Sequence, residues 1–330
     1  MSEDLYICTT YYHVYVLLLK RLTGYQKKCD VVICDDIPTG EILSFNLQNS
    51  GLFDKVWYIR QLLLPEDGGK GRLDKIFFQH KRRYRLISHL LPFDINAYRD
   101  VYIFHDDTAL GRFLNDAHKY YHLIEDSYNF FQRIKNTPQS VHIRKKNCKY
   151  VLAKILNLGY FPMGESKYVI DIEVNENSAL QIDNKKIVEL SRDGMRKRLS
   201  SDNKRLMRWI FGNPAIPNLD HCALLLTEPL FKDGVCNLER QCSIYRYVVH
   251  DLQDKGYLIV LKPHPRDDID YSWLSVHVIE RTYPIEILVD NLESELDCVA
   301  AVSSSAVYSM QAKAIYIYDN LIYGGKTNNV

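Results

Sequence analysis

The sequence has no CxxC pair and no Cys/His cluster at metal-ligand spacing, because its 8 cysteines are scattered along the chain. This distribution argues against a zinc site and against a disulfide framework. Cys8, Cys34 and Cys298 lie inside apolar, strand-like runs, where a reduced cysteine behaves as a small hydrophobic residue. We therefore expect reduced thiols and no structural zinc.

Long apolar runs are missing as well. No uninterrupted stretch is long enough to span a bilayer, and the first residues lack the basic region and apolar core of a signal peptide. We therefore expect a soluble, cytoplasmic protein. The formal net charge is only +1, which argues against a dedicated nucleic-acid-binding protein.

Positive charge is nevertheless concentrated at residues 80–85, at residues 192–198 and from Arg144 onwards. Such clusters are commonly solvated helix faces. In an enzyme that works on a lipid-linked acceptor they would instead rest on anionic phospholipid. We keep both interpretations, and with them peripheral contact with the inner face of the cell membrane. A homodimer is the other assembly kept in view.

The 330 residues and the 46% hydrophobic content suffice for two buried cores. Apolar runs alternate with amphipathic helical segments, such as residues 13–22, and this predicts α/β domains with doubly wound, mainly parallel sheets. The predicted strands lie at residues 5–8, 31–34, 56–59, 101–104, 120–124, 168–172, 223–227, 258–261, 276–279, 299–302 and 315–317.

Composition predicts the domain boundary. Beyond the predicted strand at 168–172, the stretch up to Pro217 is polar and poor in strand signals, and residues 213–218 hold two prolines, as inter-domain linkers often do. We predict an N-terminal domain at residues 1–165, a helical or linker region at 166–218 and a C-terminal domain at 219–330.

His264 lies between two prolines at the point where an apolar strand ends. Pro263 and Pro265 stiffen the backbone around it, because each proline fixes its own φ and restricts the residue before it. Lys262 and Arg266 add positive charge, which suits a phosphate or carboxylate ligand. Open α/β sheets bind ligands at such strand ends. The alternative is a rigid loop with a surface histidine.

Ser303, Ser304 and Ser305 follow the predicted strand at 299–302. Because residues 307–313 look helical, we expect the serines at a strand-to-helix turn, where hydroxyls and backbone N–H groups converge on an anion. A helix N-cap alone would also explain them. Their place one βα unit after the His-Pro turn favours a shared phosphate site.

Glu125 and Asp126 are adjacent carboxylates at the end of the predicted strand at 120–124. Two such groups are costly to hold together unless they face solvent, a cation or a substrate, and crowding raises the pKa of one of them. A raised carboxyl pKa suits a general base. The alternative is a helix N-cap, since Asp126 and Ser127 precede an aromatic stretch.

In this order, the acidic pair, the His-Pro turn and the serine run resemble the motifs of the bacterial sialyltransferases of glycosyltransferase family 52 and of the related bacterial polysialyltransferases. Leu224–Leu230 is similar to the first strand of their nucleotide-binding domain, and Tyr283–Leu288 and Leu5–Leu19 are further similar segments. The motif glycine after the acidic pair is Ser127 here. Glycine adopts backbone angles that serine reaches only at a cost, so the acidic loop departs from the family pattern.

The resemblance implies two Rossmann-like domains facing a cleft, the GT-B glycosyltransferase architecture, which closes around its substrates. It implies an inverting, single displacement on CMP-sialic acid, in which a base deprotonates an acceptor hydroxyl while the CMP phosphate leaves from the opposite face. The acceptor would be a terminal sugar, a galactoside, of a capsule or lipooligosaccharide. No metal or other cofactor is required, because protein groups can neutralise a monophosphate.

By position in the motif, Glu125 would be the base and Asp126 its orienting neighbour. His264 would donate a hydrogen bond or a proton to the leaving phosphate. The resemblance also implies a set of donor-binding residues in the second domain, namely Lys262, Pro265, Arg266, Ser303, Ser304, Ser305, Thr227 and Glu286.

The loop after the first predicted strand is expected to bind the acceptor through Thr9, Thr10, Tyr11, Tyr12 and His13. Tyrosine rings there would stack on a sugar face, and the threonines would bond its hydroxyls. Helix capping alone would also explain the threonines.

Three alternatives stay open. The protein could be a glycosyltransferase that uses another nucleotide sugar, or a non-catalytic sugar-nucleotide-binding protein of polysaccharide assembly. It could also be a phosphate-binding α/β protein unrelated to sugars. The partners expected are a nucleotide-sugar donor and a glycan or glycolipid acceptor, and no nucleic acid.

Overall fold

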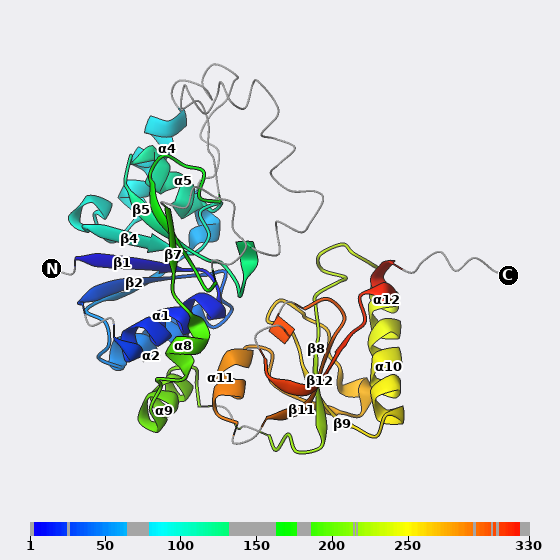
Figure 1. Cartoon of the computed structure of the whole chain (residues 1–330). Helices are drawn as coiled ribbons and strands as arrows, with labels where there is room; N and C mark the ends of the chain where they lie inside the picture. Colours follow the sequence, from blue (N-terminus) through cyan, green and yellow to red (C-terminus); the bar gives the residue numbers. More distant parts are fainter. Residues whose placement is uncertain are drawn as a thin grey trace. The chain divides into compact units, whose positions relative to one another are not determined.

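A computed structural model of the chain describes residues 3–24, 27–64, 79–131, 163–176, 186–213, 215, 217–292, 295–304, 306–307 and 310–323 (Figure 1). Ser305 and the basic cluster that begins at Arg144 lie outside the described residues. The chain divides into two compact units, Met1–Gly212 and Asn213–Val330. Each unit has its own parallel sheet, so the protein is of the α/β class.

The first unit is built on a sheet that has seven strands among the described residues, in the order β3-β2-β1-β4-β5-β6-β7, all parallel. The strands are β1 (Asp4–Cys8), β2 (Cys29–Cys34), β3 (Val56–Ile59), β4 (Asp100–Ile103), β5 (Tyr121–Ile124), β6 (Val169–Val174) and β7 (Ile187–Glu189). The order reverses between β1 and β4. Doubly wound sheets bind ligands at such a reversal, outside the carboxyl ends of the strands.

Helices cover both faces of this sheet (Figure 1). One face carries α1 (Tyr11–Thr23), α2 (Gly40–Asn49), α8 (Arg192–Arg196) and α9 (Ser201–Ile210), and the other carries α4 (Gln79–Leu90) and α5 (Ala109–Asp116). The face under α4 and α5 is apolar, because Ile7, Ile103 and Leu123 of the strands pack with Ile87 and Phe113 of the helices.

The face under α1 is aromatic and charged. The rings of Tyr6, Tyr102 and His122 stack across β1, β4 and β5, with centroid separations of 4.4 and 4.5 Å. Lys20 of α1 lies over the Tyr102 ring, with its Nζ 4.9 Å from the ring centroid. This contact places a buried cation against the ring face that attracts it.

A buried ion-pair cluster joins α1 to β6 and α8. The Nζ of Lys20 lies 2.5 Å from Oε2 of Glu173, and a guanidinium nitrogen of Arg192 lies 3.1 Å from Oε1 of the same carboxylate. A buried charge of this kind is tolerable only when it is paired. The cluster therefore fixes the position of α1 relative to β6 and α8.

The second unit has five parallel strands among the described residues, in the order β10-β9-β8-β11-β12. They are β8 (Cys222–Leu226), β9 (Leu258–Lys262), β10 (His277–Val278), β11 (Leu296–Ala301) and β12 (Ala312–Ile317). The order reverses between β8 and β11. The helices α10 (Leu238–Asp254) and α11 (Ile285–Asp290) lie on opposite sides of the sheet, and α12 (Asn320–Tyr323) follows β12 (Figure 1).

Every predicted strand is found, with ends shifted by a few residues at most. Two other expectations differ from the structure. Residues 166–212 do not form a separate region: they supply β6, β7, α8 and α9 to the first unit, because β6 pairs with β5 across a long sequence separation that local composition does not reveal. Ala312 and Lys313, expected in a helix, begin β12, where pairing with β11 overrides their helical preference. In the described ranges, no helix has the length and apolarity needed to cross a bilayer.

The buried carboxylate of Asp106 joins β4 to β5 and to the segment before β6. It accepts hydrogen bonds from the Tyr121 hydroxyl at 3.0 Å and from the backbone N–H groups of Met163 and Gly164 at 2.6 and 3.3 Å. Burial raises the pKa of this carboxyl, and the hydrogen bonds oppose that rise. The start of α5 lies directly against the backbone of Asp106.

Gly111 of α5 is the residue that permits this approach. A Cβ at this position would lie 2.0 Å from the backbone oxygen of Asp106. The substitution Gly111→Ala is therefore expected to lower the free energy of unfolding by about 2–3 kcal/mol. The measurement is chemical denaturation beside Gly194→Ala, whose Cβ would make only 3.4 Å contacts to Ser191. The control should stay within about 1 kcal/mol of wild type, and equal stability of the two variants would contradict the prediction.

Candidate functional site

The acidic pair follows β5, as predicted, but its two carboxylates have different surroundings. Glu125 is only 1% exposed. Its Oε1 accepts the backbone N–H of Phe131 at 3.2 Å, and its Oε2 accepts that of Asn175 at 2.8 Å. Glu125 therefore holds the acidic loop to the end of β6. With both oxygens bonded to the backbone, this carboxylate has little contact with solvent.

Asp126 has the more accessible carboxylate, with a side chain that is 27% exposed. Its Oδ1 lies 2.9 Å from Nε2 of His13, which is fully buried. The Nδ1 of that ring accepts the backbone N–H of Thr9 at 3.1 Å, so the ring proton is on Nε2 and is donated to Asp126. The ring also stacks on Phe104 at 4.3 Å. Among the predicted acceptor-binding residues, His13 thus contacts the acidic loop.

The rest of the predicted acceptor loop is divided between the interior and the surface. Thr10 caps α1 by accepting the N–H of His13 at 3.3 Å, and it is exposed. Tyr11 is buried, and its hydroxyl is 2.9 Å from that of Thr39 at the start of α2. Tyr12 is half-buried. Thr10 and Tyr12 therefore remain the better placed of the five to meet a ligand.

In the second unit, His264 follows β9 and is half-buried. Its Nδ1 accepts the N–H of Arg266 at 3.1 Å, and its own backbone N–H donates to the hydroxyl of Thr227 at 3.1 Å. Burial lowers the pKa of His264 to about 4, and the charges of Arg266 and Lys262 add to the shift. The ring is therefore neutral at pH 7, and its Nε2–H is a hydrogen-bond donor.

The two cations beside His264 differ in environment. Lys262 is buried, and its Nζ donates to the carbonyls of Pro263 at 2.6 Å and Arg281 at 2.9 Å. Burial lowers its pKa to about 7, while the charges of Glu286 and Glu280 act in the opposite direction. Lys262 thus ties the loops after β9 and β10 together.

Arg266 is exposed and forms a two-pronged ion pair with Asp233, at 2.8 and 2.9 Å. Its charge is therefore partly compensated before any ligand binds. Pro265 next to it is half-buried. Among the described residues, no group of three or more His, Cys, Asp or Glu side chains is placed to hold a metal ion.

Ser303 and Ser304 follow β11, on the other side of β8 from His264. Ser303 is exposed and Ser304 is buried, with its Oγ accepting the N–H of Ala306 at 3.4 Å. Sequence reasoning did not single out Glu228, which follows β8. Burial raises the pKa of the Glu228 carboxyl, and a hydrogen bond from Ser304 opposes that rise. The position of Glu228 at the end of a central apolar strand is the sequence feature that could have identified it as a candidate.

Lys262 provides a test of these surroundings through the pH dependence of stability. The unfolded lysine keeps its proton up to about pH 10.5, whereas the folded one releases it near pH 7. Because Lys262 binds more protons in the unfolded state in this window, its contribution to stability should rise with pH between about 7 and 10. Chemical denaturation across this range is expected to show that wild type gains stability with pH relative to Lys262→Met. The exposed Lys255→Met is the control and should follow the wild-type profile, and parallel profiles of wild type and Lys262→Met would refute the prediction.

The chain was compared with protein families, curated proteins and solved structures, and the family match covers the three motifs. A model of glycosyltransferase family 52 matches residues 67–320. An uncharacterized protein of Haemophilus influenzae is 32% identical over 102 residues, which are 30% of this chain and 32% of that protein, so the chain spans about a third of this relative's length. The crystal structure of the glycotransferase of kitacinnamycin aligns over 93% of this chain and 77% of that chain, with 10% identity and a TM-score of 0.45. Because the family match covers more than half of the chain and includes the acidic pair, the His-Pro turn and the serine run, this chain belongs to glycosyltransferase family 52.

Proposed function

We propose that this glycosyltransferase is an inverting sialyltransferase, which moves sialic acid from CMP-sialic acid to a hydroxyl of a terminal sugar, a galactoside, of a capsule or lipooligosaccharide. The observation that carries the proposal is the carboxyl edge of the second sheet. There, the neutral ring of His264 follows β9, and Ser303 and Ser304 follow β11, on either side of β8. Hydrogen-bond donors gathered at a strand-order reversal suit the phosphate of a nucleotide.

The role of His264 follows from its charge state. A ring with a pKa near 4 has no extra proton to give at pH 7, so it acts as a hydrogen-bond donor through Nε2. The negative charge that grows on the departing CMP phosphate strengthens this hydrogen bond in the transition state. The exposed hydroxyl of Ser303 supplies a further donor, whereas the buried hydroxyl of Ser304 is bonded to Glu228. Lys262 and Arg266 contribute from a distance, because both are already bonded to protein groups.

Asp126 is the better candidate for the base. Its carboxylate is partly exposed and is oriented by the Nε2–H of His13, whereas both oxygens of Glu125 are bonded to the backbone inside the protein. A base must reach the acceptor hydroxyl, so accessibility favours Asp126 over the first acid of the motif. Glu125 then has the supporting role, because it fixes the loop on which Asp126 lies.

Two parallel sheets, each in its own unit, suit the two Rossmann-like domains of the proposed GT-B architecture. Each sheet reverses its strand order, and each has its polar candidates at the carboxyl ends of strands at or near that reversal. We further propose that transfer needs no metal and takes place in the cytoplasm. Of the basic residues 192–198, Arg192 is buried, Arg196 is half-buried and paired with Asp193, and Lys197 and Arg198 are exposed, so the last two are the candidates for contact with the inner face of the membrane. The homodimer stays a prediction.

The first test is a CMP-release assay with CMP-N-acetylneuraminate and a panel of galactosides, with and without EDTA. Release is expected to require an acceptor and to survive EDTA. His264→Ala should lower the rate by about 100-fold, because it removes a donor to the leaving phosphate. His250→Ala, which changes an exposed histidine of the same unit, is the control. A wild-type protein that binds CMP and releases none would be a non-catalytic binder, and one that does not bind CMP would refute the proposal.

The two acids can be separated by comparing Asp126→Asn with Glu125→Gln. Asp126→Asn is expected to lower kcat by about 100-fold or more with little change in stability, because it removes the base. Glu125→Gln should lower the free energy of unfolding by about 1–3 kcal/mol, because the NH2 group that replaces one carboxylate oxygen cannot accept from a backbone N–H. The measurements are steady-state kinetics and chemical denaturation. Loss of turnover in Glu125→Gln at unchanged stability, with Asp126→Asn active, would make Glu125 the base.

A further inference from the structure

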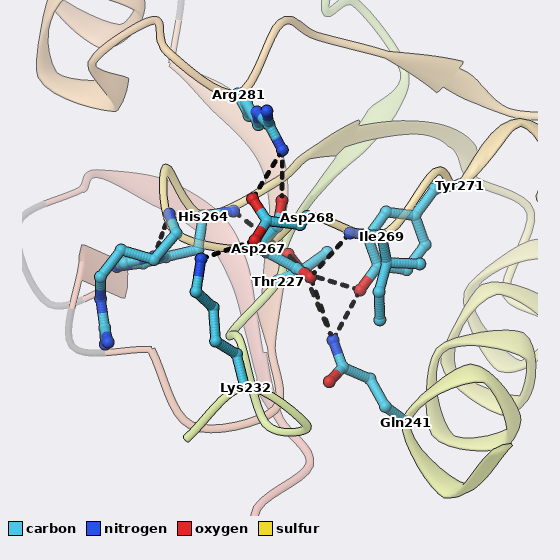
Figure 2. Close-up of polar contacts among 10 residues, drawn as sticks. Thr227, Lys232, Gln241, His264, Asp267, Asp268, Ile269, Tyr271 and Arg281 are labelled. Carbon is cyan, nitrogen blue, oxygen red and sulfur yellow. Dashed lines mark hydrogen bonds and ion pairs between the residues drawn. The ribbon is translucent and has the colours of Figure 1, made fainter. Parts of the chain in front are cut away.

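Asp267 is a buried carboxylate just beyond the His-Pro turn, and its side chain is the centre of a hydrogen-bond network (Figure 2). In the sequence alone, the acidic run at 267–270 is typical of turn or capping residues. The structure places Asp267 at 2% exposure while Asp268 and Asp270 are exposed. A carboxylate that is taken out of water needs several donors to remain charged, and those around Asp267 come from distant parts of the unit.

The contacts of Asp267 reach both backbone groups of His264. The N–H of Asp267 donates to the carbonyl oxygen of His264 at 2.9 Å, which closes the turn. Its Oδ2 accepts the hydroxyl of Thr227 at 2.7 Å, and the oxygen of that hydroxyl accepts the N–H of His264 at 3.1 Å. Because Thr227 has given its only hydroxyl proton to Asp267, its oxygen is left to act as an acceptor toward His264.

The carboxylate itself is held from the side away from the turn. The hydroxyl of Tyr271 donates to Oδ2 at 2.7 Å, and the side-chain amide of Gln241 on α10 lies 3.3 Å from the same oxygen (Figure 2). Gln241 also donates to Tyr271 at 2.9 Å. Nearer the surface, Asp268 pairs with Lys232 at 2.6 Å and with Arg281 at 2.9 Å. The network therefore runs from a helix of the unit to the turn that presents the histidine.

We propose that Asp267, acting through the hydroxyl of Thr227, is a positioning residue for His264 and sets the direction in which the Nε2–H of the ring meets the leaving phosphate. This inference rests on the proposed function for the nature of the phosphate. Thr227, which we expected to bind the donor directly, thereby has a different role, because its hydroxyl is buried and bonded to Asp267 and to the turn. The ring of His264 is then fixed by the N–H of Arg266 on Nδ1.

The orientation of the His264 ring is what Asp267 is proposed to control. A hydrogen bond to charge that develops in the transition state depends steeply on the placement of the donor, and an error of about 1 Å can cost about 100-fold in rate. Two backbone hydrogen bonds and two flanking prolines remove most freedom from His264. Deleting the Thr227 hydroxyl leaves the N–H of His264 without this acceptor and leaves the turn held at its carbonyl side only.

The chain offers a matched pair of substitutions. Thr227→Val and Tyr271→Phe each delete one buried hydroxyl that donates to Oδ2 of Asp267 at 2.7 Å. Only the Thr227 hydroxyl also contacts His264. A purely structural role predicts parallel effects of the two changes, whereas a positioning role predicts different ones. Because replacing the buried Asp267 endangers folding itself, the test uses its two hydroxyl partners.

The experiment measures three quantities on the full chain: kcat of CMP release from CMP-N-acetylneuraminate, the affinity for CMP, and the melting temperature. Thr227→Val is expected to lower kcat by about 10- to 100-fold, and Thr227→Ser, which keeps the hydroxyl, should restore most of it. Tyr271→Phe should lower the melting temperature by a similar amount and keep kcat within about threefold of wild type. Parallel losses of kcat in Thr227→Val and Tyr271→Phe would overturn the proposal.

A second readout keeps the test independent of the sialyltransferase proposal. In protein labelled with ¹⁵N-histidine, the ring signals of His264 identify its tautomer and hydrogen bonding, with His264→Ala providing the assignment. Thr227→Val is expected to shift these signals, and Tyr271→Phe to leave them in place. Such a result in a protein that releases no CMP would support the positioning role and refute the sialyltransferase function. Unchanged His264 signals in Thr227→Val would refute the positioning role whatever the activity.

Discussion

A buried carboxylate is stable inside a protein only where hydrogen-bond donors surround it, and this requirement organises the candidate residues of each unit. In the first unit, Glu125 collects backbone N–H groups from Phe131 and Asn175. In the second, Asp267 collects hydroxyls from Thr227 and Tyr271. Each buried acid draws separate chain segments together, and each lies close in sequence to the residue proposed to meet substrate.

The two halves use their buried acids in the same way but present different chemistry. Next to Glu125, the partly exposed Asp126 is held by the Nε2–H of His13, which orients a carboxylate that solvent can reach. In the second unit, the neutral imidazole of His264, three residues before Asp267, is itself the group proposed to contact the ligand. The residues of the first unit are thus equipped to take a proton, and those of the second to donate hydrogen bonds to an anion. The proposed function needs both capacities.

Much of the fold could be predicted from the sequence because strands such as β1, β2 and β8 are buried on both faces and are therefore apolar runs. β7 was missed because it is a three-residue edge strand with little buried surface. The join between β6 and the first sheet was also missed. It depends on pairing between strands that are far apart in sequence, which local composition does not record.

The candidate site was predictable to the extent that motifs mark strand ends. The motifs correctly predicted that His264, Ser304 and the acidic pair follow strands. A motif, however, does not show in which direction each side chain points. The sequence therefore could not distinguish the buried Glu125 from the accessible Asp126. For the same reason, His13 looked like a ligand-binding residue and Asp267 like part of a turn. Both roles depend on partners more than twenty-five residues away.

Helix α1 is anchored at two points, by His13 on Asp126 and by Lys20 on Glu173, which lie about 10 Å apart along its axis. The carbonyl oxygen of Glu173 also accepts the N–H of Glu125 at 2.9 Å. A substitution at Lys20, Glu173 or Arg192 that shifts these side chains would therefore also shift the acidic loop. Over evolutionary time these three positions should change together. Replacing one of them alone leaves a buried charge without its partner, whereas simultaneous replacements that keep the charges paired preserve the position of the loop.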